Sequence, residues 1–146
     1  MLLVRRSWPL LLAVACSGSD GGKPFRTTYQ DEGSICIRSA ADGKIEVTVV
    51  FPTCLSSSCD RALGTTCSAT LSGTTLVISS KGESESTGAR ECTADCGALV
   101  AKCGSSIAVP PGDYTLEHGD SSAAIVLPQS EVALFTDSAS FPPCSG

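Results

Sequence analysis

The sequence predicts an all-β domain, an antiparallel β-sandwich, with a small β-barrel of similar strand count as the alternative. Three observations indicate this class. Seven or eight short stretches favour strands, turns rich in Gly, Pro and Asp separate them, and eight cysteines lie downstream of an N-terminal leader. Short strands between such turns are typical of sandwiches and barrels. An even number of cysteines in a small exported domain is typical of a fold stapled by disulfides.

The first expected strands meet at tight turns. Residues 35–37 (ICI) begin a short strand, and Lys44–Phe51 (KIEVTVVF) alternates apolar and polar residues after an Asp42-Gly43 turn. Asp-Gly suits a two-residue hairpin, and alternation predicts a strand with one buried face. Cys67–Leu71 and Thr75–Ser79 flank a Ser-Gly-Thr turn in the same way. We therefore expect two hairpins in the first half of the domain.

Two later stretches carry weaker signals. Residues 80–91 (SKGESESTGARE) are polar with charges of both signs, which predicts a solvated loop and the most mobile segment of the domain. Residues 93–103 contain four apolar or cysteine positions spaced as on one helical face. The alternative there is a strand over 98–103, and the surrounding β pattern favours the strand.

A corner motif follows. Val109–Tyr114 (VPPGDY) resembles the corner between strands E and F of immunoglobulin-like and fibronectin type III sandwiches. That resemblance implies an immunoglobulin-like sandwich in which the Tyr114 hydroxyl bonds back to the backbone. Residues 114–118 and 123–127 then predict a final hairpin, and 132–135 predicts an edge strand.

The N-terminal residues predict export. Arg5 and Arg6 precede an apolar run over residues 8–15, which ends in small residues directly before Cys16. This order is typical of a secretory signal and is too short to span a bilayer. The segment LAVAC resembles the lipobox of bacterial lipoproteins, although the family usually has Leu where Ala13 stands.

The lipoprotein resemblance implies a location. It is a resemblance to the small, cysteine-rich, uncharacterised lipoproteins of Gram-negative bacteria, in which Cys16 would be lipidated and anchor the chain to a membrane. Ser17 follows the cysteine in place of the Asp that retains enteric lipoproteins in the inner membrane. The implied location is the outer membrane, on its periplasmic face or at the cell surface. Without lipidation, the leader is an ordinary secretory signal.

The expected organisation is a signal peptide over residues 1–15, a flexible tether over 16–30 that begins with the lipidated cysteine, and one domain over 31–146. Removing residues 1–15 lowers Lys plus Arg from 10 to 8 against 15 acidic residues, which leaves a net charge of −7. This charge argues against nucleic acid as a partner, because nucleic acid rewards basic patches.

The eight remaining cysteines form up to four disulfides by this interpretation. They are Cys36, Cys54, Cys59, Cys67, Cys92, Cys96, Cys103 and Cys144. The sequence cannot choose among their 105 possible pairings, although Cys144 is placed to tie down the C-terminus. A bridge between Cys54 and Cys59 would close a small, stiff loop over Leu55, Ser56, Ser57 and Ser58. That loop is the candidate contact surface.

Metal or redox chemistry is the alternative function. Cys92, Cys96 and Cys103 place three thiols close together in the chain, and zinc or copper(I) accepts thiolates. Against this, the chain has no Cys-x-x-Cys pair, which zinc ribbons and thioredoxin-like sites use. We expect disulfides, with no metal and no cofactor.

Catalysis has little support. His118 is the single histidine and lies near Asp120 and Ser121, but adjacent strand residues point to opposite faces. We expect His118 to cap the end of a core face, with a hydrolase as the third hypothesis. The leading hypothesis is a non-enzymatic binding or structural module of the cell envelope, with an unidentified protein or glycan as its ligand.

Overall fold

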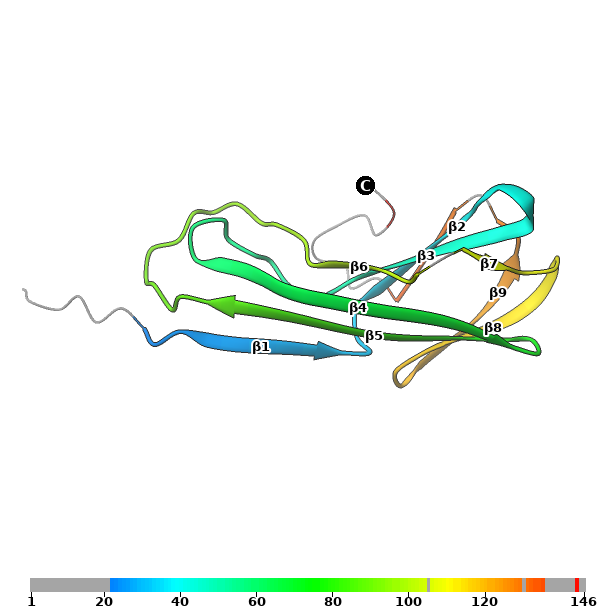
Figure 1. Ribbon diagram of the computed structural model, residues 1–146, viewed down its shortest axis with the longest axis horizontal. Helices are drawn as coiled ribbons and strands as arrows, with labels where there is room; N and C mark the ends of the chain where they lie inside the picture. The colour runs from blue at the N-terminus through cyan, green and yellow to red at the C-terminus, as the bar shows by residue number, and fades with distance from the viewer. Residues whose placement is uncertain (1–21, 105, 130, 136–143, 145–146) are drawn as a thin grey trace, which may run out of the picture.

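The computed structural model describes residues 22–104, 106–129, 131–135 and 144, and it shows an all-β sandwich of two sheets (Figure 1). The strands are β1 (Phe25–Gln30), β2 (Ser34–Ser39), β3 (Lys44–Val50), β4 (Asp60–Ser72), β5 (Thr75–Ser86), β6 (Val100–Lys102), β7 (Ile107–Ala108), β8 (Gly112–His118), β9 (Ser121–Leu127) and β10 (Glu131–Leu134). A 3-10 turn, Ala41–Gly43, joins β2 to β3. Neither sheet of the described residues closes on itself, so the sandwich prediction is confirmed and the barrel alternative is not.

The first sheet is built on the long β4–β5 hairpin. Strand β5 pairs with β4 along one edge, and on its other edge it pairs with β1 and β8 in succession. Strand β9 continues the sheet beyond β8. The pairing of β5 with β8 is parallel, and it is the one exception to the predicted antiparallel pairing among the described strands. The chain passes through the second sheet between these two strands, and that long crossover allows a parallel return.

The second sheet has the order β10-β2-β3-β6, and the two-residue β7 also pairs with β3. It packs on the half of the first sheet that contains β8, β9 and the start of β5 (Figure 1). Alternate residues of β3 and β5 fill the space between the sheets, because successive strand side chains point to opposite faces. The fully buried side chains include Ile35, Ile37, Val49, Leu76 and Leu116.

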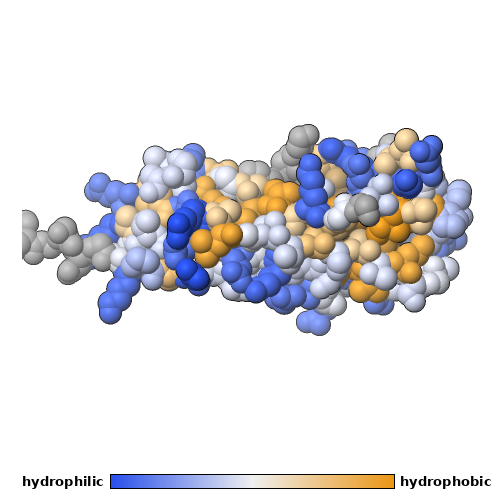
Figure 2. All heavy atoms as spheres, in the orientation of Figure 1, coloured by the Kyte–Doolittle hydropathy of each residue, from blue (hydrophilic) through white to orange (hydrophobic). Residues whose placement is uncertain are grey.

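The molecule is elongated and has two halves (Figure 1). We call the two-sheet half the sandwich end and assign to it residues 31–50, 68–80 and 100–135. We call the other half the arm and assign to it residues 22–30, 51–67 and 81–99. In the arm, the three strands β1, β5 and β4 lie under irregular segments in place of a second sheet. Hydrophilic residues cover most of the visible outer end of the arm (Figure 2).

Two predictions were wrong in the arm. Residues 80–86 belong to β5 where a mobile loop was expected, and residues 25–30 form β1 where a flexible tether was expected. In β5, charged residues point outward and Ser80, Gly82 and Ser84 are buried. The strand therefore alternates between charged and small residues, a pattern without the apolar signal that usually identifies a strand.

The corner motif is confirmed. The Tyr114 hydroxyl donates a hydrogen bond to the Pro110 carbonyl oxygen at 2.6 Å, and the Tyr114 ring is buried against the core. The hairpin of β8 and β9 and the edge strand β10 are also confirmed.

The N-terminal predictions lie outside the described residues. The signal over residues 1–15 and the lipidation candidate Cys16 both fall there. Among the described residues, no helix is long and apolar enough to cross a membrane.

Candidate functional site

Four disulfides join all eight domain cysteines. The pairs are Cys36–Cys144, Cys54–Cys96, Cys59–Cys92 and Cys67–Cys103. The expected bridge between Cys54 and Cys59 is therefore wrong, because each of these cysteines bonds to a cysteine in the connection between β5 and β6. Cys144 does tie the C-terminal region to β2, across a separation of 108 residues.

Two of these disulfides lie one inside the other at the outer end of the arm. Cys54–Cys96 encloses Cys59–Cys92, and both join the segment before β4 to the segment after β5. We call residues 54–59 and 91–97 the tip. Leu55 and Gly97 exchange two backbone hydrogen bonds, of 2.9 and 2.8 Å. The tip is thus two short chain segments held together at several points, which makes it stiff.

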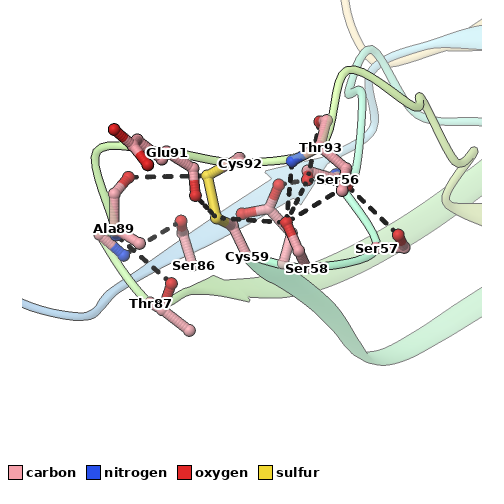
Figure 3. Close-up of a disulfide and its surroundings, with 12 residues drawn as sticks. Ser56, Ser57, Ser58, Cys59, Ser86, Thr87, Ala89, Glu91, Cys92 and Thr93 are labelled. Carbon is pink, nitrogen blue, oxygen red and sulfur yellow. Dashed lines mark hydrogen bonds between the residues drawn. A yellow bond between two sulfur atoms is a disulfide. The ribbon is translucent and has the colours of Figure 1, made fainter.

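A hydroxyl network fills the space between the two tip segments (Figure 3). The Ser56 side chain is buried, and its hydroxyl lies 3.0 Å from the Thr93 carbonyl oxygen. The Thr93 amide donates to the Ser58 hydroxyl oxygen at 2.8 Å. Ser56 and Ser58 therefore hold the two segments together. Of the four residues predicted as a contact loop, Ser57 and Ser58 are exposed, Leu55 is half-buried and Ser56 is buried.

Two carboxylates complete the network. The Ser56 amide donates to an Asp60 oxygen at 2.8 Å, and the Ser57 amide donates to an Asp95 oxygen at 3.1 Å. Hydrogen bonds from Thr93 and Ser57 lower the pKa of Asp95 below its usual value. Sequence analysis missed Thr93, Asp60 and Asp95, because their roles depend on cysteine pairing that brings distant segments together.

A shallow cleft of about 200 Å³ lies beside the tip. It is lined by Ser57, Ser58, Asp60, Arg61, Thr87 and Pro24, among others. On the neighbouring sheet face, the carboxylate of Glu85 receives Arg26 from β1 at 3.1 Å and Arg61 Nε from β4 at 2.9 Å. The exposed surface around the tip thus offers hydroxyls and paired charges.

The three thiols of the metal alternative are not brought together. Cys92, Cys96 and Cys103 bond to three different partners, so none of them is a free thiolate. Within the described residues, no group of three or more His, Cys, Asp or Glu side chains could hold a metal ion.

His118 lies at the sandwich end, at the end of a core face as expected. It is 3% exposed, and its Nε2 is 2.9 Å from the hydroxyl oxygen of Ser80, itself 2% exposed. Asp31 accepts from the Ser80 amide and the Ser79 hydroxyl. A nucleophile needs access to substrate and a base oriented by a third group. Here the Ser80 hydroxyl is buried. The Asp31 carboxylate accepts hydrogen bonds from Ser79 and Ser80 and does not orient the His118 ring by a hydrogen bond.

Burial and hydrogen bonds act together on the pKa values of this cluster. Burial lowers the pKa of His118, and the nearby Asp31 carboxylate opposes that shift in part. For Asp31, burial acts to raise the pKa, but hydrogen bonds from Gln30, Ser80 and Ser79 outweigh it and the pKa is lowered.

Comparisons with known proteins add no relative: no family model, no curated protein and no solved structure matches this chain.

Proposed function

We propose that this chain is an exported, lipid-anchored module of the bacterial cell envelope that binds a partner without transforming it chemically. The anchor would be a lipid on Cys16, on the outer membrane. The ligand would be a protein or a glycan at the periplasmic face or the cell surface. Nucleic acid is excluded from this proposal because the chain is acidic.

The observation that carries the proposal is the pairing of all eight domain cysteines in four disulfides. Disulfides persist in oxidising compartments and are rare where thiols are kept reduced. The presence of four disulfides supports a location outside the cytoplasm, in agreement with the signal-like leader.

The tip supports binding as the kind of activity. Two disulfides and the hydroxyl network limit its motion, and a stiff loop loses little conformational entropy when a ligand binds. The Ser80 hydroxyl and the His118 ring are both buried, which does not favour their use in hydrolysis.

The test is the intact mass of protein extracted from native bacterial membranes and alkylated under denaturing conditions without reduction. The proposal expects a lipid mass on Cys16 and no alkyl group on the eight domain cysteines. Absence of the lipid would overturn the anchor. Several alkylated cysteines, or stoichiometric metal in the fresh protein, would overturn the binding module and favour metal-handling or thiol-redox chemistry.

A further inference from the structure

The tip and the turns of the sandwich end lie at opposite ends of the long axis (Figure 1). Strand β4 alone has 13 residues, which corresponds to about 40 Å at the usual rise of a strand. At its far end, the Val109 amide donates to the Gly43 carbonyl oxygen at 3.0 Å, and the Thr115 amide donates to the Thr74 carbonyl oxygen at 2.9 Å. These two hydrogen bonds hold the turns of the sandwich end next to one another.

The chain enters the fold at the tip end. Phe25, the first residue of β1, pairs with Ser86 at the end of β5, and the backbone of Gly22 lies against Gly88. Six peptide steps separate Cys16 from Gly22. Six residues span at most about 20 Å when fully extended. A lipid on Cys16 would therefore hold the tip end close to the membrane surface.

Charge divides along the same axis. The arm carries five basic and five acidic residues and has no net charge. The sandwich end carries three basic residues (Arg38, Lys44, Lys102) and eight acidic ones, for a net charge of −5 with His118 neutral. Anionic lipid head groups repel negative charge and do not repel a neutral surface. Anionic lipid therefore repels the arm as a whole less than the sandwich end, although the tip itself carries Glu91 and Asp95 and no basic residue.

We propose that the tip faces the bilayer and contacts lipid head groups, so that the protein stands on the membrane and presents the turns of its sandwich end outward. This inference rests on the proposed anchoring at Cys16. It names the partner of the stapled tip: a lipid surface. The stiffness of the tip then serves its contact with lipid, and a protein or glycan ligand would meet the opposite end, some 40 Å farther out by the rise of a strand.

The chemistry of the tip suits head groups. Ser57 is an exposed hydroxyl residue at its surface, and hydroxyls donate to phosphate oxygens. The nearby carboxylate of Asp95 is occupied by donors from Ser57 and Thr93. The tip contributes few apolar groups to the core, so its conformation depends on the two disulfides.

The test compares the reactivity of native side chains along the axis. The lipidated protein is placed in vesicles of phosphatidylcholine mixed with phosphatidylglycerol. A water-soluble acylating reagent then labels lysines, which are quantified by peptide mass spectrometry. Lys23 lies at the tip end and Lys44 at the sandwich end, and both are exposed. The reference is the C16S protein, which has no lipid, mixed with the same vesicles.

We expect acylation of Lys23 to slow several-fold in the lipidated protein, while that of Lys44 does not change. Hydroxyl-radical labelling gives a second matched pair, Phe25 at 57% exposure and Val126 at 53%. Equal protection at both ends, or protection of Lys44 alone, would overturn the orientation. Intact mass reports separately whether Cys16 carries lipid, so failure of the anchor is distinguishable from failure of the orientation.

A longer tether gives the matched control. Inserting a run of Gly and Ser between Ser17 and Gly18 keeps the lipid and lets the tip move away from the surface. We expect the protection of Lys23 to fall in this variant. Unchanged protection would overturn the view that the short tether sets the orientation.

Discussion

The two ends of this molecule are stabilised by different means. At the sandwich end, branched and aromatic side chains from two sheets pack into one core, with Ile35, Leu76 and Leu116 fully buried. In the arm, the inward residues of β5 are Gly82 and Ser84, and two of the four disulfides lie wholly within the arm while a third, Cys67–Cys103, joins it to the sandwich end. Burial of apolar area stabilises the first region. In the second region, cross-links, which limit the freedom of the unfolded chain, add to the burial of Phe51 and Leu99.

The small residue Gly82 makes room for the segments that cover the sheet of the arm. A β-carbon added at Gly82 would lie 2.9 Å from side-chain atoms of both Phe51 and Leu99. The glycine therefore lets the covering segments approach the sheet closely. Phe51 also packs against Tyr29 of β1, with 5.9 Å between ring centres, and thereby links the cover of the arm to its sheet.

The largest effect should come from removing both tip disulfides, by replacing Cys54, Cys96, Cys59 and Cys92 with Ala. The outer bridge closes a separation of 42 residues, and such a ring contributes about 4 kcal/mol in the loop-closure model. We expect backbone amides of the arm to exchange faster while those of β8 and β9 keep their protection. Hydrogen exchange measures both. Equal loss in the two regions would show that the arm and the sandwich end unfold as one unit.

Leu116→Ala tests the sandwich end. Truncating a fully buried leucine costs about 3 kcal/mol, and Leu116 is 0% exposed. Denaturant unfolding should show this loss for the whole protein. Ser84→Ala, at a buried serine of the arm, is the matched change and should cost far less. A similar cost for both substitutions would contradict the division into two modes of stabilisation.

Gly82→Ala tests the close packing of the arm cover. Overfilling a packed site costs about 1–3 kcal/mol, because Phe51 and Leu99 must shift to admit the new methyl group. Gly64→Ala in β4 is the control, since an added β-carbon there meets nothing within 4 Å. Thermal unfolding of the two variants should differ, and equal melting temperatures would refute tight packing at Gly82.

Tyr114→Phe tests the corner of the sandwich end. The change removes one hydrogen bond to the Pro110 carbonyl oxygen and keeps the ring, so we expect a loss of about 1 kcal/mol. Equilibrium unfolding in urea measures it, with an unchanged slope. A neutral result would show that the corner is held by packing alone.

The smallest effect concerns pH. Burial lowers the pKa of His118 in the folded state, so the unfolded chain binds a proton first as the pH falls. The contribution of His118 to stability is fully present at pH values above its pKa in the unfolded chain, about 6.5. It declines as the pH falls toward the pKa of His118 in the folded protein. His118→Gln should flatten the stability curve across that window. Asp31, whose pKa is also lowered, acts in a more acidic window, so an unchanged slope in the variant would exclude His118 as the cause.

The sequence predicts the two ends unequally well. Strands with apolar alternation, such as Lys44–Val50 and Gly112–His118, were identified because their buried faces are visible as a period of two. The distal part of β5 was missed because its buried face is Ser and Gly, and β1 was missed because it is an exposed edge strand. The Pro-Gly-Asp-Tyr corner was identified because its contact is local, with donor and acceptor four positions apart in the chain.

The tip could not be predicted because it depends on cysteine pairing. The contact-loop hypothesis identified the correct segment and assigned it the wrong bridge, since Cys54 and Cys59 are close in the chain while their true partners, Cys96 and Cys92, become close only when β4 and β5 pair. The same pairing turns Ser56 from a candidate contact residue into a buried link to Thr93.

The connectivity of the disulfides also determines how the protein can be made. Along the chain, none of the four bonds joins two neighbouring cysteines of the eight. An oxidant that coupled the cysteines in their order along the chain would trap incorrect pairs, beginning with Cys36 and Cys54. Such bonds are corrected by exchange through mixed disulfides, over seconds to hours. Correct pairing therefore requires either that the chain folds before its cysteines are oxidised or that incorrect bonds are exchanged afterwards.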